Sequence, residues 1–81
     1  MKIEDFKEFT LLNDASFFLS GKEYYIFLLN NGYNVGQYDN EDSILFGKYK
    51  SNDENFKDMI ENWIIEGKPL KELLDKIELN Y

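Results

Sequence analysis

The sequence predicts a single α+β domain in which an antiparallel meander of three to four strands is flanked by an N-terminal helix and two C-terminal helices. The length, 81 residues, leaves room for one domain over residues 1–81. Apolar residues recur at helical spacing near both ends of the chain. Between these ends, residues 16–50 alternate aromatic and β-branched runs with turn residues, which is typical of strands joined by tight turns.

Residues 3–12 are predicted to form a short amphipathic helix. Its apolar positions are Ile3, Phe6, Phe9 and Leu12, and charged residues lie between them. This three-residue spacing drifts from the α-helical period of about 3.6 residues, but it still favours a short helix with an apolar side. The pair Asn13-Asp14 then marks a loop.

The middle of the chain predicts three strands, or four when the short first segment is counted. The segments are Ser16–Ser20, Glu23–Asn30, Tyr33–Tyr38 and Ser43–Lys50. Asn31-Gly32 is the best hairpin signal, because both residues tolerate the positive φ of a type I′ turn. Residues 39–42 form a polar turn before the last strand.

The predicted turns give the sheet two apolar faces, because successive side chains of a strand point to opposite sides. A two-residue turn at Asn31-Gly32 places Ile26 opposite Gln37, and a four-residue second turn places Val35 opposite Phe46. One face is aliphatic-rich and is expected to pack under the C-terminal helices: Ile26, Leu28, Val35, Ile44 and Phe46. The other is aromatic, with Gly36 and Gly47 leaving space for a ring: Tyr25, Phe27, Leu29, Tyr38, Leu45 and Tyr49.

Residues 51–81 are predicted to be helical. Ser51 and Glu54 fit a capping box, in which the serine hydroxyl accepts from the N–H three residues on and the glutamate reaches back. Gly67 is placed to end this first helix and Pro69 to begin a second, although residues 63–70 also fit an extended link. The apolar stripes are Phe56, Met59, Ile60, Trp63 and Ile64, and then Leu70, Leu73, Leu74 and Ile77.

Residues 62–74, NWIIEGKPLKELL, follow an aromatic meander. This arrangement resembles short uncharacterised acidic proteins of low-GC Gram-positive bacteria. About half of the chain comes from residues with AT-rich codons, which also indicates a low-GC genome. The resemblance implies an α+β fold in the bacterial cytoplasm and carries no known activity.

Composition excludes many functions. The chain has no histidine and no cysteine, and all nine basic residues are lysine. Histidine-based catalysis, thiolate chemistry and thiolate zinc sites are therefore ruled out. Only oxygen ligands remain, which suit calcium or magnesium rather than zinc or copper. A net charge of −7 disfavours nucleic-acid binding. Residues 39–42 hold three carboxylates without the ligand order of a calcium loop, so we interpret them as a solvated turn and expect no cofactor or metal. A hydrolase with paired carboxylates remains an alternative.

The longest apolar run, Tyr24 to Leu29, is far shorter than the roughly 20 residues that a membrane helix needs. The acidic N-terminus shows no signal peptide, so we expect a cytoplasmic protein without membrane contact. The acidic segment 51–81 has three interpretations: a mimic of a phosphate backbone, a docking surface for a basic protein, or two solvated helix faces.

The aromatic face leads to the functional hypothesis. Either the N-terminal helix covers it, giving three layers, or it stays open and binds a partner. The sequence predicts a non-enzymatic protein-binding module, of the small inhibitor, immunity or phage accessory type. It would use the aromatic face and the acidic surface of the predicted helices in residues 51–81. The alternative is a structural homodimer joined through that face.

Overall fold

The computed structural model describes residues 1–12 and 14–80 and confirms the α+β class with an N-terminal helix. The predicted loop residue Asn13 lies outside the described residues. The elements in chain order are α1 (Ile3–Thr10), β1 (Ala15–Leu19), β2 (Lys22–Leu29), β3 (Gly32–Gln37), β4 (Ser43–Phe46), α2 (Asn52–Asn62), β5 (Ile64–Ile65), β6 (Lys68–Pro69), the 3₁₀ helix η1 (Leu70–Glu72) and β7 (Glu78–Asn80).

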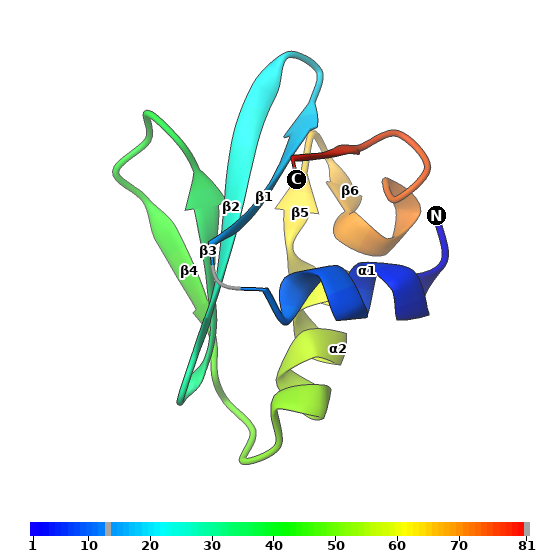
Figure 1. Cartoon of the computed structure of the whole chain (residues 1–81). Helices are drawn as coiled ribbons and strands as arrows, with labels where there is room; N and C mark the ends of the chain where they lie inside the picture. Colours follow the sequence, from blue (N-terminus) through cyan, green and yellow to red (C-terminus); the bar gives the residue numbers. More distant parts are fainter. Residues whose placement is uncertain (13, 81) are drawn as a thin grey trace.

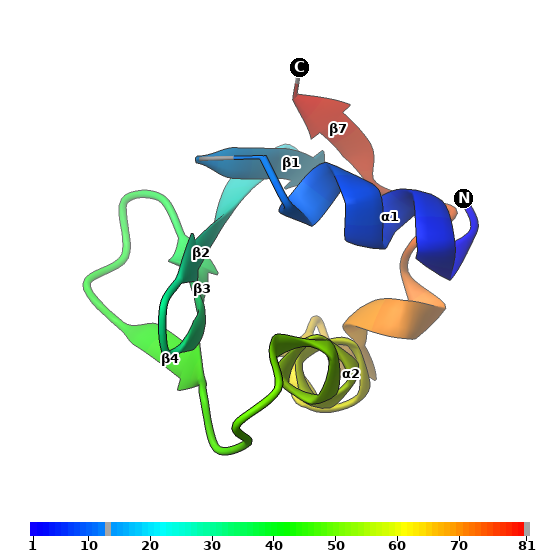
Figure 2. The same cartoon turned by 60° about the horizontal axis from the view of Figure 1, so that its bottom comes forward.

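A five-stranded antiparallel sheet forms one side of the molecule, with strand order β4-β3-β2-β1-β7. Strands β1 to β4 are the predicted meander, and the short β1 belongs to it. The sheet curves around the core, and α1, α2 and η1 all lie on its concave side (Figures 1 and 2). The fifth strand, β7, was not predicted; it brings Leu79 opposite Phe17.

The strand register differs from the prediction by two residues. Leu29 pairs with Gly32, so the β2–β3 turn is centred on Asn30-Asn31, and Ile26 lies opposite Val35 instead of Gln37. Gly32 is needed inside the strand, because a Cβ there would lie 2.3 Å from the carbonyl oxygen of Phe46. A shift of two keeps every side chain on its predicted face.

The second hairpin shifts in the same way. Tyr33 instead of Val35 lies opposite Phe46, and β4 ends at that residue instead of continuing to Lys50. Tyr33 is 1% exposed and Tyr24 is buried, so both tyrosines join the core face that the prediction filled with aliphatic residues. Ile44, predicted on that face, is 44% exposed because β4 is an edge strand.

Aromatic rings from both helices meet on the concave face. The ring of Phe17 stacks on Tyr24 at 5.3 Å between centroids and meets Trp63 edge-on at 5.8 Å. Phe6 of α1 contacts Phe17 at 6.3 Å and Phe56 of α2 at 6.2 Å. The alternative in which the N-terminal helix covers the other face, giving three layers, is therefore wrong: Phe6 and Phe9 are buried in the same core as α2. Ile3 and Leu12, also predicted on its apolar side, are 43% and 52% exposed, and Leu12 lies beyond the end of α1.

The C-terminal segment departs most from the prediction. Trp63 is extended (φ −82°, ψ 103°), and β5 and β6 form a hairpin whose turn residues Glu66 and Gly67 both have positive φ. The extended link is therefore confirmed over Trp63–Pro69. Strand alternation leaves Ile64 57% exposed, so its predicted place on the buried stripe is wrong.

Over residues 70–80, the part of this segment that the structure describes, the predicted second C-terminal helix is absent. Leu70, Leu73 and Leu74 are buried as expected, but in a 3₁₀ turn and the turns after it. The N–H of Leu73 donates to the Leu70 carbonyl and that of Lys76 to the Leu73 carbonyl, both at 2.8 Å. A spacing of three residues satisfies a 3₁₀ turn as well as an α-helix, so the leucine pattern could not separate them.

Candidate functional site

The convex side of the sheet, which we call the outer face, carries five of the six predicted binding residues. Tyr25, Phe27 and Leu29 alternate along β2, and register places Leu45 of β4 on the same side. The rings of Tyr25 and Phe27 stack with centroids 4.8 Å apart, and Tyr38 meets Tyr25 edge-on at 5.3 Å. The structure therefore brings these five side chains together on the sheet.

Gly36 keeps the centre of this face flat. It lies opposite Tyr25, and a Cβ at Gly36 would lie 2.5 Å from the tyrosine hydroxyl oxygen. The aromatic ring therefore lies across the backbone of β3. Gly36 thus leaves the space in which the end of the Tyr25 ring lies.

Phe18 extends the outer face and was missed in the sequence analysis. It lies on β1 opposite Glu23, in the same alternation as Ser16 and Tyr25. Phe17 and Phe18 are adjacent, and strand alternation alone assigns one of them to the core and the other to solvent. The assignment needed the register of β1, which the sequence did not provide.

The outer face is apolar at its β4 side and acidic at its β1 end. Leu45 is 51% exposed, and Glu23 and Glu78 lie at the β1 end of the face. Partial burial raises the pKa of the Tyr38 hydroxyl, and nearby Glu23 adds to the effect. The hydroxyl therefore stays neutral across the physiological range and can donate a hydrogen bond.

Tyr49, the sixth predicted residue, is not on the outer face; that assignment is wrong. The side chain of Asn55, 1% exposed, holds the Tyr49 backbone against α2. The Tyr49 N–H donates to Asn55 Oδ1 at 2.9 Å, and Asn55 Nδ2 donates to the Tyr49 carbonyl oxygen at 3.1 Å. A polar residue four positions before Met59, on the buried helix face, was the available signal for this contact.

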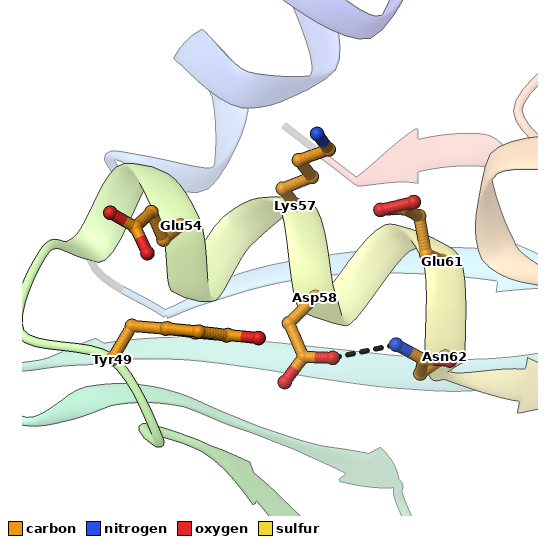
Figure 3. A pocket seen from close by; sticks show the side chains of 6 residues that line it. All are labelled: Tyr49, Glu54, Lys57, Asp58, Glu61 and Asn62. Carbon is orange, nitrogen blue, oxygen red and sulfur yellow. Dashed lines mark hydrogen bonds between the residues drawn. The ribbon is translucent and has the colours of Figure 1, made fainter.

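Tyr49 instead forms one wall of a depression of about 380 Å³ beside α2 (Figure 3). The other lining residues come from the exposed side of the helix: Glu54, Lys57, Asp58, Glu61 and Asn62. Asn62 Nδ2 donates to Asp58 Oδ1 at 2.6 Å. We call this region the acidic helix surface. Its carboxylates attract cationic groups. Among the described residues, no group of three acidic side chains is arranged to hold a metal ion.

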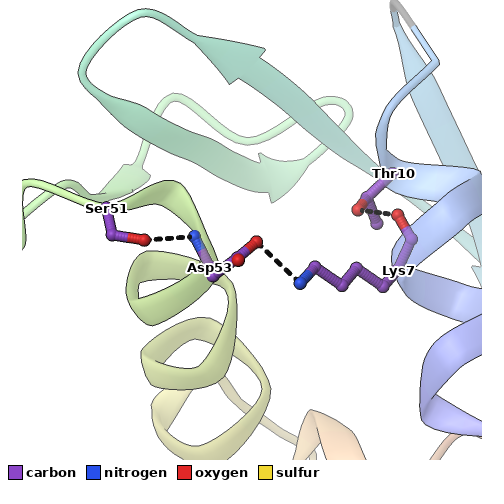
Figure 4. Close-up of polar contacts among 4 residues, drawn as sticks. All are labelled: Lys7, Thr10, Ser51 and Asp53. Atoms are coloured by element: carbon purple, nitrogen blue, oxygen red, sulfur yellow. Dashed lines mark hydrogen bonds and ion pairs between the residues drawn. The ribbon is translucent and has the colours of Figure 1, made fainter.

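Polar contacts fix the start of this helix (Figure 4). Lys7 of α1 forms an ion pair with Asp53 at 2.7 Å, and the Thr10 hydroxyl donates to the Lys7 carbonyl oxygen at 2.7 Å. Ser51 is the N-cap as predicted, but its hydroxyl accepts from Asp53 N–H at 3.2 Å, two residues on instead of three. Glu54 lines the depression instead.

A second hollow, of about 420 Å³, opens where the concave face meets β5. Its apolar lining residues are Tyr24, Ile44, Trp63, Ile64 and Ile65. Burial raises the pKa of the Tyr24 hydroxyl, and the nearby carboxylate of Glu66 raises it further. The polar part of the lining includes Lys22 and the carboxylates of Asp42 and Glu66, at the margin of this apolar surface.

No protein-family model, curated protein or solved structure matches the chain at a significant level. The resemblance to acidic proteins of low-GC bacteria therefore stays a prediction. Across residues 1–12 and 14–80, none of the helices has the length and apolarity to span a bilayer.

Proposed function

We propose that this chain is a non-enzymatic protein-binding module whose docking surface is the outer face of the sheet. The observation that carries the proposal is one-sided coverage. Every described helix lies on the concave side, while the convex side presents a row of apolar and aromatic residues (Figure 2). They are Phe18, Tyr25, Phe27, Leu29, Tyr38 and Leu45.

The composition of this surface favours a protein as the ligand. Tyrosine and phenylalanine are enriched at the centres of protein interfaces, where a broad apolar ring is buried and a hydroxyl finds a partner. Small-molecule sites are concave, whereas the rings of Tyr25 and Phe27 stack along one strand of a sheet. A flat aromatic surface fits another folded surface better than a small ligand.

The acidic helix surface has a different role in this proposal. It lies beside α2, away from the outer face, so one small partner would not contact both (Figures 2 and 3). A net charge of −7 nevertheless acts at long range and accelerates the approach of a basic partner. The expected partner therefore has an apolar contact patch within a positively charged surface.

Site-specific photocrosslinking in the cells that make the protein tests the proposal. A benzoylphenylalanine at position 27 replaces one aromatic ring with another in the middle of the outer face. The matched control carries the same group at Lys71, which is exposed on η1 on the opposite side. We expect one dominant crosslinked protein from position 27 that is absent from position 71.

A competition experiment shows whether the crosslink at position 27 reports specific binding. Excess unlabelled protein should suppress the crosslink, whereas excess of the variant Tyr25→Ala/Phe27→Ala should not. Identical products from both positions, or none from position 27, would contradict the proposal. A product of twice the chain mass from position 27 would support the alternative, a homodimer joined through the outer face.

A further inference from the structure

The free edge of β4 lacks the features that normally prevent strands from pairing between molecules. Among the described residues, β4 pairs only with β3, so one side of its backbone meets no other strand. Its four residues include neither a charge nor a proline. Ile44 and Leu45 point to opposite faces, yet both are exposed, by 44% and 51%. An unprotected apolar edge of this kind is a template for another strand.

The other edge of the sheet is protected. Strand β7 has three residues, and its two outward positions, Glu78 and Asn80, are polar. Asn80 also donates hydrogen bonds to Ser16 Oγ at 3.0 Å and to Glu23 at 3.2 Å. The difference between the edges makes β4 the side where pairing is expected.

Charges of opposite sign flank β4. The turn before it holds Asp39, Glu41 and Asp42, and the segment after it holds Lys48 and Lys50. Within the described part of the chain, none of the five forms an ion pair. Lys48 contacts the ring of Tyr49, with Nζ 5.3 Å from the centroid. The strand therefore has an acidic end and a basic end, both without counter-ions.

We propose that two copies of this chain pair through β4, antiparallel across a two-fold axis, so that their sheets join. Antiparallel pairing sets the acidic end of each strand beside the basic end of the other. Because of the two-fold axis, each contact between an acidic end and a basic end occurs twice in the dimer. A parallel arrangement would instead set acid against acid and lysine against lysine, so the charge pattern selects a second copy in this orientation.

Side-chain alternation narrows the register. The concave faces stay on one side only if residues of the same face oppose each other. When Leu45 lies opposite Leu45 of the second copy, Ile44 lies opposite Phe46 and Asp42 opposite Lys48. This register covers the exposed apolar residues of the edge and matches the charges. Of the outer-face residues it involves only Leu45, at the edge strand, and it leaves Tyr25 and Phe27 free, so it does not rest on the function proposed above.

The net charge of −7 on each copy opposes association. At 0.15 M salt the screening length is about 8 Å, so distant charges contribute little and the close pairs at β4 dominate. A contact of four residues per chain is small, and we expect a dimer that forms in the micromolar to high-micromolar range.

Charge reversal measured by sedimentation velocity at 0.15 M salt tests the proposal. Asp42→Lys alone and Lys48→Glu alone should each weaken the dimer by about fivefold or more, because each opposes like charges twice. The double variant Asp42→Lys/Lys48→Glu should restore association to within about twofold of the wild type. The matched controls, Glu72→Lys and Lys71→Glu, change the net charge equally on η1 and should have little effect. A wild type that stays monomeric at about 500 µM, above the expected range of dissociation, or a double variant without restoration, would overturn the proposal.

Disulfide trapping tests the register, since the chain has no cysteine of its own. Opposed residues of an antiparallel pair have Cα atoms about 4.5–5.5 Å apart, which suits a disulfide. With oxidised glutathione, Leu45→Cys should form a covalent dimer, whereas Ser43→Cys, also on the outer face but opposite Gly47 of the second copy, should not. Equal trapping at both positions would overturn the edge contact and support packing between outer faces. Slower hydrogen exchange of the β4 amides at high concentration would support the edge.

Discussion

Both faces of the sheet carry aromatic and aliphatic side chains, and the two faces have opposite environments. Along β2, Tyr24 and Ile26 are buried, while Tyr25 and Phe27 between and beside them are half-buried. The four side chains are equally suited to a core. The difference comes from α1 and α2, which both lie on the concave side. Hydropathy therefore identifies the strands, but the helices decide which face becomes the core.

The largest expected difference between the faces is in the cost of removing a ring. Phe17→Ala removes a fully buried side chain that contacts Phe6, Tyr24 and Trp63, and should cost about 3–5 kcal/mol. Phe27→Ala on the outer face should cost about 1 kcal/mol or less, because its ring is already in contact with water. Urea denaturation followed by circular dichroism measures both. Equal losses would show that the outer face is also a core.

Two glycines sharpen the comparison. Gly32→Ala places a Cβ against the Phe46 carbonyl at a residue with φ +133°, and should cost about 2–3 kcal/mol because backbone must move. Gly36→Ala meets the hydroxyl end of the Tyr25 side chain, which can swing away, so the loss should be about 1 kcal/mol or less. The same denaturation experiment applies. Gly36→Ala should, however, weaken docking on the outer face, since it displaces the ring.

Asn55 connects the core to the acidic helix surface. Asn55→Ala leaves the Tyr49 N–H and carbonyl without these partners and should cost about 1–3 kcal/mol. Asn55→Asp keeps an acceptor for the Tyr49 N–H but loses the donor to the Tyr49 carbonyl. We expect this variant to lose stability and to show faster hydrogen exchange of the backbone amides around Tyr49. If Asn55→Ala leaves that segment protected, the segment is held by other contacts.

The smallest expected effect is a pH dependence. Burial raises the pKa of Tyr24 above its ordinary value of 10.0, so the folded protein favours the neutral phenol. The stability from this group is complete below pH 10 and falls as the pH rises through the higher folded value, because the unfolded chain ionises first. Denaturation midpoints between pH 8 and 11 should decline less for Tyr24→Phe than for the wild type. Equal slopes would assign the decline to other groups.

Much of the sheet could be predicted because the errors in the predicted register do not change which face a side chain occupies. A register error of two residues leaves Ile26 and Phe27 on their correct faces, so the aromatic face was predicted although both turns were displaced. Strand β7 was missed because Glu78–Asn80 is short and follows a leucine pattern that also fits a helix. The position of α1 could not be predicted, since both faces offered apolar partners.

The candidate site shows the same limit. Alternation brought Tyr25, Phe27 and Leu45 together, since strand geometry alone determines their side. Tyr49 was assigned to that face by extending β4 to Lys50, whereas the strand ends at Phe46. Contacts from a distant element, here the Asn55 amide, decided its position, and strand periodicity contains no information about them.

The chain has one tryptophan, and Trp63 is buried against Phe17 and Tyr24 on the concave side. Its intrinsic fluorescence therefore reports whether the interior is intact. A ligand seated on Tyr25 and Phe27 would leave that emission unchanged while altering the tyrosine signal. Occupancy of the exposed aromatic surface and loss of native packing can thus be read separately in one unlabelled sample.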